Sequence, residues 1–152
     1  MTQTVQGIIA RTKGEPVELT DIVIPDPGAN DVVVKIQACG VCHTDMAYRD
    51  GGITDEYPFF LGHEAAGTVV EVGAAIRDLR PGDRVVMTFL PRCGACEACD
   101  TEGRLPCTPG SAANERGDLL GGGRRLHADG ESVAHHLGVS GFATHAVVDA
   151  SA

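Results

Sequence analysis

Short runs of β-branched residues, separated by glycine and proline, most constrain the fold of this chain. They alternate in polarity or stay apolar over five to eight positions, which is typical of strands. Twenty glycines and eight prolines punctuate them, and no long amphipathic helix or internal repeat interrupts the pattern. The sequence therefore predicts a mainly β fold, with strands at 4–10, 17–24, 31–38, 67–73, 83–89 and 141–148.

Three other segments have a different local pattern. Residues 42–50 lack β-branched runs and predict a turn or two of helix. The stretch 108–132 is polar and glycine-rich. Its second part predicts a hairpin that turns at Asp129-Gly130, since both positions tolerate a positive φ.

Length and charge limit the class of protein. A chain of 152 residues with 43% hydrophobic positions is enough for one domain with a real core. Its net charge of -9 argues against a nucleic-acid partner, because phosphate binding needs clustered Lys and Arg. No signal-peptide pattern or membrane-length apolar run is present in the sequence, so we expect no membrane partner and a reducing, cytoplasmic location.

Four of the six cysteines lie in the stretch "CGACEACDTEGRLPC", residues 93 to 107. The spacing is C-x2-C-x2-C-x7-C, and the glycine between the first pair is typical of the tight turn of a metal knuckle. In a reducing compartment such a cluster more often binds metal or reacts than forms disulfides. Four free thiols in a surface loop are the alternative.

A second constellation is divided between "GVCHTD" (40–45) and "LGHEAAG" (61–67). Cys42 and His63 supply two of the three protein ligands that a catalytic zinc takes. Asp45 and Glu64 stand beside them and could orient the ligands from outside the coordination sphere. Taken singly, Cys42 could be a small buried residue, His63 a core histidine and Glu64 a surface charge.

These motifs occur together with "GHEAAGTVVEVGAAI" (62–76) and "PGDRVV" (81–86), and the combination resembles the signature of zinc-dependent medium-chain alcohol dehydrogenases. The resemblance spans essentially the whole chain and implies a GroES-like, partly open barrel with short helices over residues 1–152. It also implies a lobe at about 91–110 that holds a structural zinc. The ligands of that zinc would be Cys93, Cys96, Cys99 and Cys107.

The activity implied by the resemblance is hydride transfer from a zinc-polarised alcohol to NAD(P). Thr44 would accept the alcohol proton, and His43 would contact the cofactor pyrophosphate unless it is simply exposed to solvent. Phe89 would line the substrate pocket, with an ordinary strand core position as its alternative. Many relatives place a histidine five residues after the cysteine ligand, and here that residue is Ala47, so we expect the proton to leave through water or the cofactor ribose.

The substrate is open between two kinds of molecule. Residues 47–67 look closest to mycothiol-dependent formaldehyde dehydrogenases, and Asp55 and Glu56 would then face a polar thiol adduct. Class III relatives carry an anion-binding arginine four residues after the last knuckle cysteine. Here that residue is Ser111, which disfavours a glutathione adduct and leaves a mycothiol adduct or a plain primary or aromatic alcohol.

The family continues into a Rossmann domain with a further cysteine ligand, and neither is found in these residues. We therefore expect an N-terminal catalytic domain, or a truncated or split gene product, whose 152 residues alone do not oxidise alcohols. The full-length enzyme is expected to be a homo-oligomer. The alternative is a non-enzymatic zinc-binding GroES-like module.

Overall fold

The strands form a barrel and a second sheet, and hydrophobic side chains from both pack in one core. In the computed structural model, which describes residues 2–152, five strands close the barrel in the order β1-β2-β7-β8-β4. Their bounds are β1 (Gln3–Ala10), β2 (Glu18–Ile24), β4 (Phe59–Phe60), β7 (Leu126–Ala128) and β8 (Glu131–His135). Most barrel pairs are antiparallel, and β4 with β8 is the parallel one.

The second sheet has four strands in the order β6-β5-β3-β9. They are β3 (Asp31–Gly40), β5 (Glu64–Val72), β6 (Arg84–Met87) and β9 (His145–Asp149). Successive residues of β3 belong to different cores: Val33 packs with the barrel interior, whereas Val32 and Val34 pack with Val69 and Val148 on the other face. This period of two explains why β3 reads as a continuous apolar run in the sequence.

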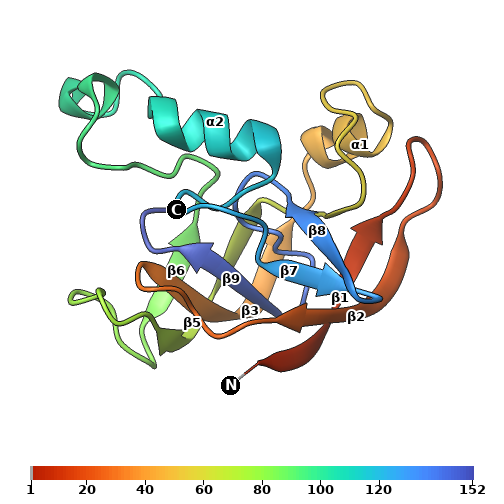
Figure 1. Ribbon diagram of the computed structural model, residues 1–152, viewed down its shortest axis with the longest axis horizontal. Coiled ribbons are helices and arrows are strands. Elements are labelled where there is room, and N and C mark those ends of the chain that lie inside the picture. Colours follow the sequence, from red (N-terminus) through yellow and green to blue (C-terminus); the bar gives the residue numbers. More distant parts are fainter. Residues whose placement is uncertain (1) are drawn as a thin grey trace.

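Three short helical segments lie on one side of the strands, as Figure 1 shows. They are α1 (His43–Arg49), the 3₁₀ segment η1 (Glu97–Thr101) and α2 (Thr108–Arg116). Among the described residues no helix is both long and apolar enough to cross a membrane. The prediction of a mainly β, GroES-like barrel with short helices is confirmed.

Helix α2 occupies residues 108–116, in the stretch that the sequence marks only as polar and glycine-rich. Its sequence has no apolar stripe, so periodicity could not find it. The helix depends on its ends: the Cys107 side chain accepts the Gly110 N–H at the N-terminus, a proline lies in the first turn, and Gly117 ends the helix at φ 68°.

The predicted hairpin is present, with Asp129 at φ 52° and Gly130 at φ 82° between β7 and β8. Strand bounds differ more. The strand expected at 67–73 begins at Glu64, and the last strand begins at His145 instead of residue 141. The earlier start of β5 matters for function, because it places Glu64 on the strand and His63 directly before it.

Candidate metal centres

His63 reaches the interior through a glycine turn. Gly62 adopts φ 89°, and a Cβ at this position would lie 2.4 Å from the backbone nitrogen of Phe142. Only glycine satisfies both the positive φ and the close backbone contact. The turn delivers the His63 side chain to a position where the residue is 2% exposed.

Cys42 stands at the N-terminus of α1, and Asp45 lies in the first turn of that helix. The Cys42 N–H donates to Oδ2 of Asp45 at 3.0 Å, while the Gly62 N–H donates to Oδ1 at 3.1 Å. Nδ1 of His63 lies 3.2 Å from the same Oδ1. One buried carboxylate thus ties the start of α1 to the turn that carries His63.

The ligand atoms of Cys42, His63 and Glu64 all lie within 4.8 Å of one another. Nε2 of His63 is 4.0 Å from Oε1 of Glu64, on the opposite side of the ring from Asp45. Glu64 therefore faces the same space as the thiol, whereas Asp45 lies behind the imidazole. Our sequence interpretation gave both acids an orienting role, and the geometry separates the two.

His136 is the residue that the sequence analysis missed. It follows β8, is 1% exposed, and places Nε2 at 3.1 Å from Oδ1 of Asp45 and 3.2 Å from Nδ1 of His63. Its position 73 residues from His63 in the chain leaves no local spacing signal. The only available clue was a pair of adjacent histidines in an otherwise apolar segment, "VAHHLGV" (133–139).

The Asp45 carboxylate is anionic despite its burial. Burial alone raises its pKa, but hydrogen bonds from His136 and the Cys42 N–H, with the nearby imidazoles, hold the pKa at about 2. Burial lowers the pKa of His136 and outweighs the carboxylate beside it. The pair thus favours a carboxylate next to a neutral imidazole.

Thr44, His43 and Phe89 surround this cluster in different ways. The Thr44 hydroxyl lies 3.4 Å from the Cys42 thiol, and both residues are half-buried. His43 is exposed. Phe89 meets the His63 ring edge-to-face at 5.6 Å; it lies beyond the end of β6 and is 40% exposed, which excludes its alternative as a strand core residue.

An open, mainly apolar hollow of about 310 Å³ lies beside His63, Glu64 and Phe89. Asp55 and Glu56 do not line it: they pair with Lys13 at 3.0 Å and Arg124 at 2.6 Å. The expectation that these two acids face the substrate thus has no support in their contacts. Phe59 and Phe60 are core residues of β4.

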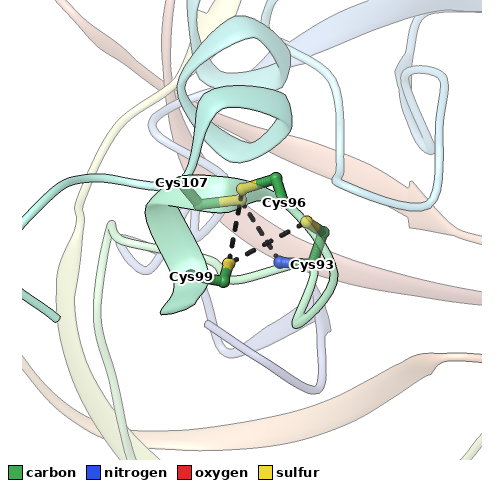
Figure 2. Close-up of side chains that lie close together, drawn as sticks. All are labelled: Cys93, Cys96, Cys99 and Cys107. Atoms are coloured by element: carbon green, nitrogen blue, oxygen red, sulfur yellow. Dashed lines mark hydrogen bonds between the residues drawn. The ribbon is translucent and has the colours of Figure 1, made fainter. Parts of the chain in front are cut away.

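The four clustered cysteines converge on one point, as Figure 2 shows. Their sulfurs lie within 4.8 Å of one another, with 3.6 Å between Cys96 and Cys99 and 3.9 Å between Cys96 and Cys107. All six cysteines of the chain are unpaired. Separations of this size exclude disulfides within the cluster, since an S–S bond is about 2.05 Å long.

Hydrogen bonds from backbone N–H groups stabilise the thiolate form of two of these sulfurs. The Thr108 N–H is the main cause that lowers the pKa of Cys96 to about 6. Burial raises the pKa of Cys107, but N–H donors from Cys93 at 3.3 Å and Gly110 at 3.4 Å outweigh it. Thiolates are the form that binds metal.

Little else holds this lobe together. Within residues 91–110, the buried apolar side chains are Pro91, Ala98 and Cys107. The Arg92 guanidinium donates to the carbonyls of Ala98, Cys99 and Leu105 at 3.1 to 3.3 Å and so links both ends of the loop. A loop with so few apolar contacts needs another source of stability, which a bound metal can supply.

Cys39 stands apart from both clusters. It packs against the core that contains Val34 and Val69, and burial raises its pKa to about 11. A thiol with so high a pKa is a poor metal ligand or nucleophile at neutral pH. Cys39 therefore acts as a small packing residue.

A barrel and sheet with a thiol, an imidazole and a carboxylate in one cluster, and a four-thiol lobe beside them, define a domain with two candidate metal centres. Comparison with known proteins gives the family. The family described as "Alcohol dehydrogenase GroES-like domain" matches residues 28–152. The chain belongs to this family, and its relatives are zinc-binding medium-chain alcohol dehydrogenases.

Individual relatives agree with this assignment. The provisionally named alcohol dehydrogenase D of Mycobacterium tuberculosis is 36% identical over 135 residues, which are 89% of this chain and 36% of that protein. An alcohol dehydrogenase zinc-binding domain protein of Burkholderia ambifaria superposes with a TM-score of 0.91 at 34% identity, over 99% of this chain and 41% of that one. Benzyl alcohol dehydrogenase of Acinetobacter calcoaceticus superposes with a TM-score of 0.81 at 30% identity, over 97% of this chain and 39% of that one. The chain thus spans about two fifths or less of these relatives.

Proposed function

We propose that this chain is the catalytic domain of a zinc-dependent, NAD(P)-linked alcohol dehydrogenase. The observation that carries the proposal is the convergence of Cys42, His63 and Glu64 within 4.8 Å, with the buried Asp45 behind the imidazole. A structural module has no need for an open ligand set of this kind, and a carboxylate behind a ligating histidine is the usual way to fix its tautomer.

The donor sets fit zinc at both places. One thiolate, one imidazole and one carboxylate are ligands that zinc takes in catalytic sites, and four thiolates are a closed structural set. Cys42, His63 and Glu64 would hold the first ion, and Cys93, Cys96, Cys99 and Cys107 the second. When bound at the first place, zinc supplies Lewis acidity that lowers the pKa of an alcohol hydroxyl.

The residues around that place have separate tasks. Thr44, whose hydroxyl lies 3.4 Å from the Cys42 thiol, accepts the alcohol proton and passes it toward water or the cofactor ribose, because Ala47 offers no imidazole. Asp45 keeps a proton on Nδ1 of His63 and leaves Nε2 free as a ligand atom. Exposed His43 is positioned to contact the cofactor pyrophosphate.

A primary alcohol with an apolar or aromatic side is the favoured substrate class. The hollow beside Phe89 is mainly apolar, and the two acids that could have faced a thiol adduct are engaged in ion pairs elsewhere. The similarity to benzyl alcohol dehydrogenase points the same way. A polar mycothiol adduct would leave hydrogen-bonding groups unpaired against such a surface.

The proposal is tested first by metal content. The purified chain should bind zinc at two places, and Cys42→Ser or His63→Gln should remove one of the two ions while Cys39→Ala removes none. The reaction is then assayed on the longest form of the protein that its gene encodes, with NAD⁺ or NADP⁺ and with benzyl alcohol, short primary alcohols and mycothiol plus formaldehyde. Formation of reduced nicotinamide that Cys42→Ser abolishes would support the proposal.

The second candidate is a non-enzymatic zinc-binding module, which the four-thiol lobe alone would satisfy. Zinc at the lobe, none at Cys42 and His63, and no nicotinamide reduction would favour it.

The unpaired state of all six cysteines fits our expectation of a reducing, cytoplasmic location.

A further inference from the structure

We propose that His136 is a positioning residue for the candidate metal ligands, and that one buried water molecule fixes its ring. In this arrangement Nε2–H of His136 donates to Asp45, which holds His63 and Cys42, while Nδ1 of His136 accepts from the water. The inference rests on the proposed metal site at Cys42 and His63. It concerns the groups behind that site.

Asp45 is the centre of this network. Its Oδ1 lies 3.1 Å from the Gly62 nitrogen, 3.2 Å from Nδ1 of His63 and 3.1 Å from Nε2 of His136. Its Oδ2 accepts from the Cys42 nitrogen. A carboxylate that is 2% exposed needs donors on both oxygens, and His136 is the one donor here that comes from neither α1 nor the His63 turn.

The contacts decide where each imidazole carries its proton. His63 must donate from Nδ1 to Asp45 if its Nε2 is to face Cys42 and Glu64. Nε2 of His136 faces the same carboxylate, and a lone pair pointed at an anion would be repelled, so the proton of His136 belongs on Nε2. Nδ1 of His136 is then an acceptor without a protein partner.

The residues that line a small cavity beside His136 carry further buried polar atoms without a partner in residues 2–152. The cavity measures about 10 Å³, room for about one water molecule, and is lined by His135, His136 and Asn114 together with parts of α1 and α2. Three buried polar atoms of these residues have no partner among the described residues: Nδ1 of His135, Nδ1 of His136 and Oδ1 of Asn114.

Their hydrogen-bonding roles follow from their other contacts. Nε2 of His135 accepts the Arg125 N–H at 3.2 Å, so the His135 proton is on Nδ1, which makes this buried atom of a cavity-lining residue a donor. Asn114 donates its Nδ2 to the Phe89 carbonyl at 2.9 Å, which leaves Oδ1 as an acceptor. One donor and two acceptors are what a single water satisfies with three hydrogen bonds.

The packing around His136 makes the ring a fixed part of the structure. Its ring contacts Tyr48 edge-on at 4.6 Å and Phe59 at 5.4 Å, and its backbone N–H donates to Ser140 Oγ at 3.0 Å. These contacts would survive replacement by phenylalanine, which has a similar ring and no nitrogen. Glutamine places an amide near the position of Nε2 and can still donate to Asp45.

The first test reads the tautomers directly in the ¹⁵N-labelled chain. Long-range ¹H–¹⁵N spectra should show the proton on Nε2 of His136 and on Nδ1 of His135, and a nuclear Overhauser effect should join bound water to the His135 Nδ1 proton. A His136 proton on Nδ1 would overturn the proposal, as would a His135 ring without contact to water. This measurement needs no variant and no metal.

The second test follows Zn²⁺ binding to wild type, His136→Phe, His136→Gln and the control His145→Gln, a partly exposed histidine on β9. The four-thiol lobe fills first and serves as an internal reference. Binding at His63, followed by its Nε2 resonance, should weaken roughly 10- to 100-fold in His136→Phe and return to within about threefold of wild type in His136→Gln. Lobe binding and the control should not change.

The outcomes separate this inference from the function it rests on. Equal weakening in His136→Phe and His136→Gln, parallel weakening at the lobe, or no weakening at all would overturn the positioning role while the metal site stands. Absence of any Zn²⁺ effect on His63 in wild type would overturn the metal site and the positioning role together.

Discussion

Thr44 and Asp45 are adjacent in the chain but have different environments. Asp45 is 2% exposed and bound by N–H groups, whereas Thr44 is half-buried and its hydroxyl reaches the Cys42 thiol at 3.4 Å. A hydroxyl can both accept and donate a proton, whereas a carboxylate saturated by donors holds its geometry. This division supports the proposal that Thr44 transfers the proton and that Asp45 orients the ligands.

Replacing Thr44 should therefore affect chemistry more than binding. In the complete enzyme we expect Thr44→Ala to lower kcat by roughly 10²-fold or more, with cofactor affinity nearly unchanged, because a positioned proton-transfer group contributes about that much. Thr44→Ser keeps the hydroxyl and is the matched control. Steady-state kinetics with NAD(P)⁺ measure both, and full activity in Thr44→Ala would exclude the relay.

His135 predicts a dependence of stability on pH. Burial lowers its pKa to about 3 in the folded chain, against about 6.5 in the unfolded chain. The folded state thus keeps the ring neutral where the unfolded state takes up a proton. Its stabilising contribution is complete above about pH 6.5 and decreases as the pH falls toward about 3, by about 1.4 kcal/mol per pH unit.

The matched variant is His135→Gln, whose side-chain oxygen can accept the Arg125 N–H in place of Nε2. Urea unfolding at a series of pH values should show wild type losing stability faster than the variant below about pH 6.5. Acid release of zinc affects both proteins alike. Parallel curves would mean that His135 is protonated in the folded state or already shielded in the unfolded one.

Elements with a regular pattern of apolar residues could be predicted from the sequence. Elements that depend on capping residues or on neighbouring strands could not. The alternation in β1 and β2 and the apolar run in β3 reflect burial on one or two faces, and a single sequence carries that signal. Helix α2 has no such stripe and depends on Cys107 and Gly117. The two-residue strand β4 exists because β1 and β8 flank it, which only the tertiary fold provides.

Gly117, the residue that ends α2, should be sensitive to substitution. It adopts φ 68°, and an added Cβ would lie 2.5 Å from the Cβ of Ala134. Gly117→Ala should therefore lower the free energy of unfolding by the roughly 1–3 kcal/mol typical of strained backbone, with a further cost from the clash. Gly122→Ala is the control, since Gly122 has φ 99° but no atom within 4 Å of an added Cβ.

Chemical denaturation of both variants measures the difference. The control variant carries the cost of a positive φ without a clash. Any larger loss of unfolding free energy in Gly117→Ala therefore measures the contact between the end of α2 and β8. Equal losses would show that β8 shifts to accommodate the methyl group.

At the scale of the whole molecule, the candidate ligand motifs could be found in the sequence because each is contiguous. Cys42 to Asp45 form the start of one helix, and His63 with Glu64 form one turn and strand. The contact between these segments and His136 arises from the closing of the barrel, and no spacing in the chain encodes it. For the same reason the separation of Glu64 from Asp45 by the His63 ring became visible only in the structure.

The lobe and the barrel should respond differently to loss of zinc. The barrel core draws on strands β1, β2, β3, β4, β7, β8 and β9, whereas the apolar side chains buried within residues 91–110 are Pro91, Ala98 and Cys107. Zinc binding to four thiolates is coupled to folding of the segment that carries them. Chelation should therefore unfold the lobe and loosen the start of α2, which Cys107 caps, while the barrel stays folded.

Hydrogen exchange with mass spectrometry tests this directly. After chelation, peptides from 91–110 should exchange at nearly the unfolded rate, and peptides from β3 and β5 should keep their protection. Cys96→Ser should reproduce the effect without a chelator, and Cys39→Ala should not, because Cys39 belongs to neither ligand group. Simultaneous loss of protection in β3 and β5 would instead show that lobe and barrel unfold as one cooperative unit, since the zinc-loaded and zinc-free proteins differ only in the bound metal.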